Sequence, residues 1–524
     1  MSRLSSFARV IAAGVLLACV SLAEAPATPE VPAPVRASIP AAAPAALPTP
    51  AAPTYGQLSD EAVATMLHAY YAGNGLWRDC PEPRCWVHNS DWGSDALTNT
   101  LYMRWKTTTD TSVPPILAAL ALSERLYKPP CFGGKHCLLW SDVPMWDSVA
   151  ASREHSALPH DSIALSKAIA AFWSVEGSPV YDVGACPAIR YQRPFGRGDR
   201  LKTLETDSNG IKAALLLYGE THDPRYLSIA RTRYAAARRY FLDPHLALYS
   251  VYVFDDGATC RQAPHRYFAS ANGNMIWNGL ALARATGITR YRQDALATAH
   301  AVVGSLSDPN GIFTDLQAEN DLEEPLVEAM LEIATDENAD FAKQWLLDNA
   351  AAAYSARRED GTYGRFFDGP PPEATVTAWQ TNGGFAAEIA AASLQPGASP
   401  AANAWEGARF VPDEIISVPA TINFRGRGIA LIGTLGEVCC QPGHARIFVD
   451  GVETVNAIGT WQNKSSSGQT FPDSVLFAWR WPTEGTHRIT LMPGIYDAKE
   501  GGAFFHARGY TVVGGSGETA SPVP

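Results

Sequence analysis

The chain has 524 residues, of which 46% are hydrophobic and 18% are charged. Because soluble domains usually carry about 25% charged residues, this composition excludes a disordered acidic chain and a charge-rich coiled coil. The net charge is −12, from 41 basic and 53 acidic residues, and the basic residues form no dense cluster. We therefore do not expect this protein to bind nucleic acid or an anionic membrane surface. The 14 Trp, 19 Tyr and 19 Phe favour an uncharged, hydroxyl-rich ligand such as a glycan.

The N-terminal residues predict export. Residues 1–25 hold two arginines before an apolar run at 10–20, which is too short to span a bilayer and indicates a secretory signal. A lipobox-like stretch that ends at Cys19 leaves a lipid anchor open as the alternative processing site. Residues 26–54 are rich in Pro and Ala and predict an extended linker. We expect a periplasmic, outer-membrane-anchored or extracellular protein that contacts the membrane only through an anchor at Cys19.

The cysteines favour disulfides over a metal site. There are nine, and setting Cys19 aside leaves eight, whose spacings are not those of zinc sites and which no histidine pair accompanies. They occur as Cys80/Cys85, Cys131/Cys137 and Cys439/Cys440, with Cys186 and Cys260 further apart. Beyond these close pairs the connectivity stays open, and either of Cys439 and Cys440 can pair elsewhere.

Helical signals fill residues 58–395. Residues 59–61 supply a capping serine and two acids ahead of an apolar-periodic stretch, and Pro114 and Pro115 are typical of a first helical turn. About twelve helices are predicted, near 58–71, 94–106, 116–122, 141–152, 161–173, 207–219, 224–241, 269–286, 290–306, 323–334, 338–355 and 376–392.

These helices recur in pairs. The stretches 219–230 and 285–295 each contain a turn rich in Gly and Thr and then a helix with a tyrosine in its first turn, Tyr226 or Tyr291. A looser third copy begins at residue 336. The repeat indicates helical hairpins. We predict an all-α domain at residues 55–395, in which six hairpins close into an (α/α)6 toroid.

The composition changes after Leu394. Residues 395–400 read as a linker, and period-two patterning follows. Short strands are predicted at 422–424, 429–433, 445–451, 475–477 and 487–491. Residues 405–524 therefore predict an all-β sandwich.

Three stretches of the helical part resemble glycoside hydrolase family 76, the endo-α-1,6-mannanases. They are residues 206–230, which begin Thr-Asp-Ser-Asn, residues 272–287, and residues 379–384. The resemblance implies an (α/α)6 toroid, cleavage of α-1,6-mannosidic bonds with retention, and two adjacent aspartates at the head of an inner helix. Asp207 stands at the first of these positions. The chain departs from the family at the second, where Ser208 supplies no carboxyl, and this puts mechanism and substrate in question.

The β part resembles galactose-binding-like sandwiches. The resemblance lies in residues 424–433, 443–451 and 484–489, which occur in that order. It implies an accessory module of a carbohydrate-active protein.

Glycosidic cleavage requires two carboxyl groups. The first candidate catalytic pair is Asp207 with Glu205, at a helix start where the dipole favours an anion; the competing interpretation is that Asp207 only caps the helix. The second candidate pair is Asp255 and Asp256, the only adjacent aspartates, which an Asp-Gly turn also explains.

Further residues are candidates for substrate binding, although core packing or solvation competes for each. The predicted substrate-binding residues are Asp91, Trp92, Asp95, Asn272, Trp277 and Trp379. Trp77 and Tyr363 are further stacking candidates, and the acidic run Asp315, Glu319, Asp321, Glu323 and Glu324 either forms a solvated first turn or faces the toroid centre. A set of His265, Tyr267, Asn272 and Asn274 would instead suit a polysaccharide lyase.

The sequence thus predicts an exported glycoside hydrolase, α-1,6-mannanase-like, with a polysaccharide or oligosaccharide as substrate. The alternatives are a non-catalytic glycan-binding protein on the same scaffold, a different toroid endo-glycanase, and a polysaccharide lyase. No motif implies a cofactor or a metal, and we expect a monomer.

Overall fold

In the computed structural model, the described residues are 52–83, 85, 87–88, 92–127, 140–194, 200–314, 323–401, 403–435, 444–459, 471–493, 506–517 and 521–522. Residues 52–524 form one compact unit. The predicted signal, the lipobox at Cys19 and most of the predicted linker lie outside the described residues. Every helix among the described residues is too short or too polar to cross a lipid bilayer.

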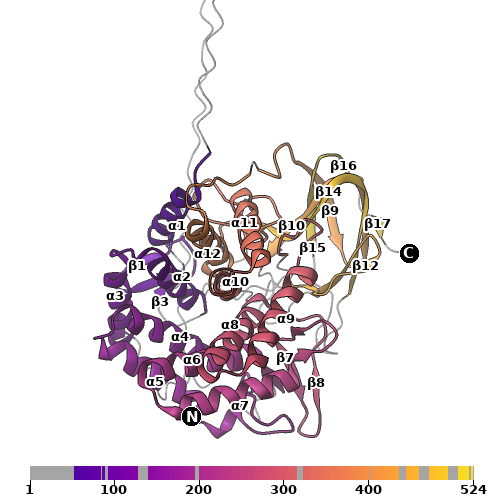
Figure 1. The fold of residues 1–524 in the computed structure, drawn as a ribbon. Coiled ribbons are helices and arrows are strands. Elements are labelled where there is room, and N and C mark those ends of the chain that lie inside the picture. Colours follow the sequence, from indigo (N-terminus) through magenta and orange to yellow (C-terminus); the bar gives the residue numbers. More distant parts are fainter. Residues whose placement is uncertain are drawn as a thin grey trace, which may run out of the picture. The chain divides into compact units, whose positions relative to one another are not determined.

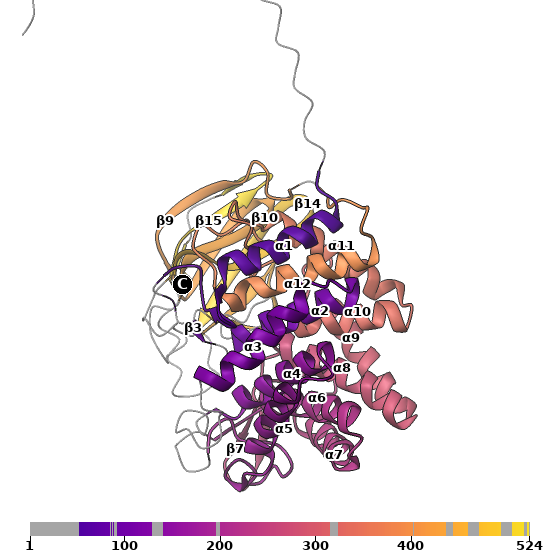
Figure 2. The same ribbon diagram turned by 90° about the vertical axis from the view of Figure 1, so that its left-hand side faces the viewer.

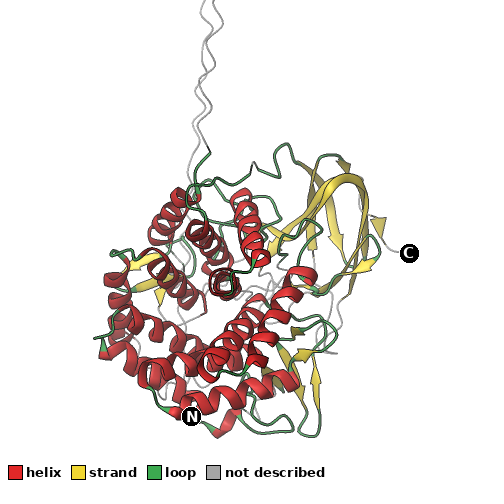
Figure 3. Ribbon diagram, viewed as in Figure 1, coloured by secondary structure: helices red, strands yellow, loops and turns green. Residues whose placement is uncertain are grey.

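The described part of the chain holds twelve α-helices, one for each predicted helical run (Figures 1 and 3). They are α1 (Tyr55–Ala69), α2 (Trp92–Thr108), α3 (Val113–Tyr127), α4 (Asp142–Ala157), α5 (Ser162–Glu176), α6 (Leu204–Thr221), α7 (Pro224–Tyr240), α8 (Ala269–Thr286), α9 (Thr289–Ser305), α10 (Glu324–Asp336), α11 (Asp340–Ser355) and α12 (Ala378–Leu394).

The helices form a closed double ring, which confirms the toroid. Each even-numbered helix contacts the next even-numbered one, and α12 contacts α2, so the inner ring closes. Helices α3, α5, α7, α9 and α11 pack outside against inner neighbours in the sequence, whereas α1 packs against α12 (Figures 1 and 2). Because one outer helix returns the chain between successive inner helices, all inner helices run in the same direction. Their first turns therefore meet at one end of the ring.

The hairpin turns follow the predicted pattern. His222 ends α6 with φ 56° and Gly287 ends α8 with φ 70°, the left-handed conformation that terminates helices. The tyrosine of the next first turn then packs on its neighbours: the Tyr226 ring lies 5.4 Å from that of Phe172, and the Tyr291 ring lies 5.3 Å from that of Tyr234. These contacts dock the outer helices α7 and α9 against their outer neighbours.

The interior of the ring carries a buried ionic network that the sequence analysis did not predict. Glu328 accepts hydrogen bonds from Arg153 and, at 2.7 Å, from Lys212 Nζ. Arg153 also lies 3.3 Å from Glu324, and Lys212 Nζ donates to Asn274 Oδ1 at 3.0 Å. Since these groups are almost fully buried, each charge depends on its partners. Asn274 is therefore used in this network, which gives it a structural role.

Short strands lie in the connections between the helices of the toroid. The sequence analysis missed them because two to four residues are too few to show a periodicity. Their hydrogen bonds join the loops that connect the helices into small antiparallel sheets. The strands are β1 (Tyr71–Gly73), β2 (Leu76–Arg78), β3 (Val87–His88), β4 (Leu201–Thr203), β5 (Leu242–Asp243), β6 (Leu248–Tyr249), β7 (Tyr252–Asp255) and β8 (Cys260–Gln262).

Two disulfides confirm the interpretation of the cysteines. Cys80 bonds to Cys85, as their spacing suggested, and Cys186 bonds to Cys260 at a sequence separation of 74. The remaining cysteines, Cys19, Cys131, Cys137, Cys439 and Cys440, lie outside the described residues.

The C-terminal part is all-β, as predicted (Figure 3). Hydrogen bonds connect its described strands into one antiparallel sheet in the order β12-β11-β14-β10-β15-β9, with β13, β16 and β17 at its margins. The long strands β10 and β14 pair along most of their length around a buried apolar core that includes Ile422, Phe424 and Leu476. The strands are β9 (Arg409–Ser417), β10 (Ala420–Leu435), β11 (His444–Val449), β12 (Val452–Glu453), β13 (Ile458–Gly459), β14 (Phe471–Pro493), β15 (His506–Val513), β16 (Ser516–Gly517) and β17 (Ser521–Pro522).

The β domain is hydrogen-bonded to the toroid. Asn456 exchanges two bonds with the backbone of Tyr267: its Oδ1 accepts from the amide at 2.8 Å, and its Nδ2 donates to the carbonyl at 2.9 Å. His265 Nδ1 lies 3.0 Å from the carbonyl of Val455. Trp405 Nε1 donates to the carbonyl of Asp368 at 2.9 Å. His265 and Tyr267, proposed from sequence for a lyase, therefore lie at this junction.

Candidate active site

A small pocket with a mixed aromatic and polar lining lies where the first turns of the inner helices meet. Its free volume is about 10 Å³, about the space of one water molecule. It is lined by Trp92, Asp142, Trp146, Gln192, Thr203, Glu205, Tyr252 and Phe268. Three of the inner helices, α2, α4 and α6, thus contribute side chains to one site.

The start of α6 positions Glu205. Strand β4 leads into the helix, and the Thr203 hydroxyl caps it by accepting the amide N–H of Glu205 at 3.2 Å. The hydroxyls of Ser141 and Thr206 lie 2.6 Å apart and connect the start of α6 to that of α4. Glu205 is therefore held in the first turn of α6, beside the first turn of α4.

The Glu205 carboxyl is buried, with 7% of the residue exposed. Its pKa is raised to about 8, mainly by burial; the hydrogen bond from Ser270 opposes this rise, and the negative charge of Asp142 contributes to it. That bond joins Ser270 Oγ to Glu205 Oε1 at 2.5 Å. At neutral pH the carboxyl consequently holds a proton that it can donate.

Asp142 is the second carboxyl of the pocket. It is the first residue of α4, and its Oδ2 accepts the indole N–H of Trp92 at 2.8 Å. The sequence analysis did not select Asp142 or Ser270. The available signal was a helix starting Ser-Asp, the same pattern of an acid in the first turn that singled out Asp207.

Asp207 faces a different environment from Glu205. Residues two apart on an α-helix project about 200° apart. Asp207 Oδ2 accepts the backbone N–H of Arg190 at 3.0 Å, and its charged neighbours are Arg190, Lys202 and Glu176. Burial raises its pKa to about 8 as well. Its Oδ1 has no hydrogen-bond partner among the described residues. The predicted pair therefore shares one helical turn but has two separate sets of neighbours.

Ser208 is fully buried at the position where the resemblance implies a second aspartate. Its carbonyl accepts the Asn278 side-chain N–H at 2.8 Å, which ties α6 to α8. A carboxyl at residue 208 is absent, so a second carboxyl at the pocket has to come from another element.

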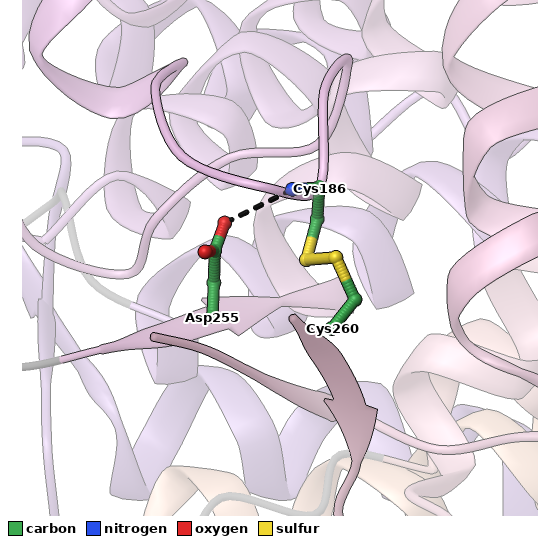
Figure 4. Close-up of side chains that lie close together, drawn as sticks. All are labelled: Cys186, Asp255 and Cys260. Atoms are coloured by element: carbon green, nitrogen blue, oxygen red, sulfur yellow. Dashed lines mark hydrogen bonds between the residues drawn. A yellow bond between two sulfur atoms is a disulfide. The ribbon is translucent and has the colours of Figure 1, made fainter. Parts of the chain in front are cut away.

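The structure gives Asp255 and Asp256 positions in a turn. The Asp255 carboxylate accepts the amide of Ala185 at 3.0 Å. It also accepts the amide of Cys186 at 3.1 Å (Figure 4). Asp256 Oδ1 accepts the amides of Ala258 and Thr259, and these bonds and the Thr259 hydroxyl hold its pKa below its usual value. These contacts match the competing Asp-Gly turn interpretation.

Asp255 also lies beside a disulfide rather than at a metal centre. Cys186, Cys260 and Asp255 bring their ligand atoms within 4.8 Å of one another. The two sulfur atoms are bonded to each other (Figure 4), so neither thiolate is available as a metal ligand. We infer that the disulfide and the Asp255 carboxylate hold the loop before β4 in place.

Of the predicted substrate-binding residues, some lie at the starts of α2 and α12, some lie in the packed part of α8, and one lies outside the described residues. Trp92 and Trp379 lie together, with ring centroids 6.2 Å apart, and a Cβ on Gly93 would come within 2.0 Å of Trp379 Nε1. Asp95 is buried one turn further along α2. Asp91 lies outside the described residues.

Asn272 and Trp277 lie in the packed part of α8. The Asn272 amide is used by the backbone of Tyr249 and Phe268. The Trp277 ring lies 5.2 Å from Lys212 Nζ, at the ionic network. The structure does not bring either side chain to the pocket.

The remaining sequence candidates are also core or network residues. Trp77 is buried and donates to Thr98, Tyr363 is buried against Phe385, and Glu324 pairs with Arg153. Glu323 is buried at the start of α10 against Gly383. Asp315, Glu319 and Asp321 lie outside the described residues.

Comparison with known proteins identifies the fold. No protein-family model matches the sequence, and no curated protein matches it. One similar solved structure is the family 76 α-1,6-mannanase of Salegentibacter sp. HEL1_6, with a TM-score of 0.56 and 19% identity over 65% of this chain and 99% of that one. That structure is an inactive variant in which two adjacent aspartates are replaced by alanine, in complex with an α-1,6-mannotetraose.

Further solved structures share the toroid. A family 76 α-mannanase of Bacteroides thetaiotaomicron has a TM-score of 0.54 at 15% identity, over 65% of this chain and 96% of that one. Dfg5 of Chaetomium thermophilum, in complex with glucosamine, has a TM-score of 0.52 at 14% identity, over 67% and 92%. The chain therefore has the fold of the family 76 glycoside hydrolases.

Proposed function

We propose that this protein is an exported glycoside hydrolase that cleaves an uncharged polysaccharide or oligosaccharide with Glu205 as the proton donor. The observation that carries the proposal is the Glu205 carboxyl. It lies in the first turn of an inner helix, its pKa is raised to about 8, and a second carboxyl, Asp142, lines the same pocket. This combination of two carboxyls in unlike environments is what glycosidic cleavage requires.

The chemistry assigns one role to each carboxyl. Glu205 gives its proton to the glycosidic oxygen as the bond to the anomeric carbon breaks, so the leaving sugar departs as a neutral alcohol. Asp142, in its ionised form, attacks the anomeric carbon or removes a proton from the attacking water. The hydrogen bond from Trp92 fixes the orientation of this carboxyl.

Asp207 remains the second candidate for the proton donor, because its resemblance to the family position and its raised pKa both support it. One of its oxygens accepts the Arg190 amide, and Asp207 is not among the described residues that line the pocket. We therefore rank it after Glu205.

An α-1,6-mannan is the first substrate to test. Two of the similar toroids are described as α-mannanases, and one of them holds an α-1,6-mannotetraose. The acidic net charge and the aromatic residues at the helix starts suit a neutral sugar. Export, with either signal cleavage or a lipid anchor at Cys19 as the processing, and a monomeric state complete the proposal.

A glycan-binding protein without catalysis is the second candidate. Ser208 in place of a carboxyl, together with a pocket of only about 10 Å³ among the described residues, favours it. A binding protein retains affinity for a glycan but releases no product.

A glycan panel separates the two candidates. The purified protein is incubated with α- and β-linked mannans, glucans, galactans and xylans, and products are separated by chromatography. The hydrolase predicts shortened oligosaccharides from at least one neutral glycan. Binding without any product supports the second candidate, and neither binding nor product contradicts both.

A further inference from the structure

A second groove lies outside the candidate active site, where the toroid meets the β domain. Its volume is about 420 Å³, within the range of about 300–1,000 Å³ typical of ligand pockets. The toroid contributes the end of α9 and the loop after it, and the β domain contributes β12 and β14. The lining residues are Gly304, Ser305, Leu306, Ser307, Pro309, Thr314, Val449, Asp450, Val452, Glu453, Thr454, Val455, Asn456, Trp479 and Trp481.

Two tryptophans of β14 form an aromatic wall in this groove. The Trp481 ring stacks on His487 with centroids 3.8 Å apart, and His487 Nδ1 lies 2.9 Å from Asp450 Oδ2. The Trp479 ring is likewise stacked, with its centroid 6.2 Å from that of Phe477. Both tryptophans are half-buried, so part of each side chain remains exposed.

The polar lining complements the aromatic wall. Two polar atoms of lining residues, Trp479 Nε1 and Ser307 Oγ, are buried and have no hydrogen-bond partner among the described residues. Asp450 and Glu453 supply carboxylate acceptors, and the Arg446 bond lowers the pKa of Glu453. No Lys, Arg or His belongs to the described lining. Stacked rings and carboxylate acceptors together match a hydroxyl-rich, uncharged ligand, and the described lining offers an anion no cationic side chain.

The groove lies at the same end of the toroid as the candidate active site. Outer helix α9 ends at Ser305, and the chain then continues to the inner helix α10, so this loop is on the end where the inner helices begin. Residues 265–267, just before α8, contact the β domain at the same end. A chain bound in the groove is thus held on the face that carries Glu205.

We propose that the groove between α9 and β14 is a second binding site for neutral oligosaccharides, separate from the candidate active site. Trp481 and Trp479 stack against sugar rings, and the carboxylates of Asp450 and Glu453 accept sugar hydroxyls. The site goes beyond the proposed hydrolysis, because it requires binding only.

The test measures binding with the full chain, without relying on turnover. Glu205→Gln serves as the background so that substrates stay intact. Affinity electrophoresis and calorimetry are run with α-1,6-mannan, β-mannan, β-glucan and xylan as neutral probes, and with polygalacturonate as the anionic probe. Binding is compared for Trp481→Ala, Gly304→Arg and Phe410→Ala.

These variants isolate the groove from general effects on folding. Trp481→Ala removes the stacking ring. Gly304 is exposed and an added Cβ meets no atom within 4 Å, so Gly304→Arg adds a long side chain at the groove from a position where the Cβ itself is accommodated. Phe410 lies on β9 in the same sheet and outside the groove, which makes Phe410→Ala the matched aromatic control.

The proposal expects at least one neutral glycan to bind and both groove variants to weaken that binding about tenfold, with Phe410→Ala unchanged. If Trp481→Ala is unfolded by circular dichroism, Gly304→Arg decides alone. Equal binding by Gly304→Arg and Phe410→Ala overturns the proposal, and so does binding of polygalacturonate only or of no probe. If the wild-type protein releases product and the Gly304→Arg variant binds the glycan with unchanged affinity, the proposed groove site is wrong but the proposed hydrolase activity stands.

Discussion

The indole Nε1 of Trp92 donates a hydrogen bond to Oδ2 of Asp142 across 2.8 Å. This bond joins the first residue of α2 to the first residue of α4. Since Asp142 raises the pKa of Glu205 on the next inner helix, the three inner helices α2, α4 and α6 act on one carboxyl. The site is thus built from three consecutive hairpins, not from one motif.

Removing the Asp142 carboxyl is expected to impair catalysis. Asp142→Asn should lower the rate of product release about 100-fold or more, the usual contribution of a catalytic carboxyl. Trp92→Phe keeps an aromatic ring but loses the bond, and should cost about tenfold. Trp105→Phe, at the far end of α2, is the control. A wild-type rate in Asp142→Asn would remove this residue from the mechanism.

The stability of the protein should fall as pH rises through the buried carboxyls. Burial raises the pKa of Glu205 from 4.5 to about 8 and that of Asp207 from 3.8 to about 8. The folded protein therefore keeps protons that the unfolded chain releases above pH 4 to 5, so the free energy of unfolding decreases up to pH 8 and levels above it.

Denaturant titrations at pH 5, 6, 7 and 8 measure this dependence. Glu205→Gln removes one of the two protons and should flatten the pH dependence. Asp340→Asn changes an exposed carboxyl in the first turn of α11 and should leave the slope as it is. Identical slopes in wild type and Glu205→Gln would show that this carboxyl does not keep its proton on folding.

The two described disulfides should differ in their contribution to stability. Cys186–Cys260 closes a loop with a separation of 74 and Cys80–Cys85 one with a separation of 5. Loop-closure entropy gives about 4 kcal/mol for the longer loop and about 2 kcal/mol for the shorter. Pairwise Cys→Ser variants, unfolded in denaturant, measure the two values. A larger loss for the short loop would contradict the expected order.

The ionic network inside the toroid should be costly to break on one side. Lys212→Met leaves Glu328 buried with one cation fewer and should destabilise the protein by about 3–5 kcal/mol. Combining it with Glu328→Gln removes the excess negative charge, so the double variant should be less unstable than the sum of the two single ones. Thermal unfolding of the four proteins completes the cycle. Strict additivity would mean that the two groups are not coupled.

The helical architecture followed from the sequence because each helix is long enough to show its period. The repeated turns at His222 and Gly287 and the tyrosines after them also revealed the hairpins. Closure of the ring was an inference from a count of helices, and the contact between α12 and α2 confirms it.

The site was harder to predict, because its residues come from different hairpins. Glu205 was selected as a neighbour of Asp207 and its exact environment depends on Asp142 and Ser270, 63 and 65 positions away in the sequence. Two residues apart on a helix, Glu205 and Asp207 point to different sides, which a linear motif hides. Asn272 binds the backbone of Tyr249, and Trp277 packs against Lys212. Both contacts join parts of the chain that only the folded ring brings together.

The most direct test of the central claim is the rate of product release from the glycan that the wild-type protein cleaves, starting with α-1,6-mannan, measured for wild type, Glu205→Gln and Asp340→Asn at pH 6. If Glu205 is the proton donor, Glu205→Gln loses at least about 100-fold of the rate while Asp340→Asn retains it, and both stay folded. A folded Glu205→Gln protein that cleaves at the wild-type rate would contradict the mechanism proposed for this site.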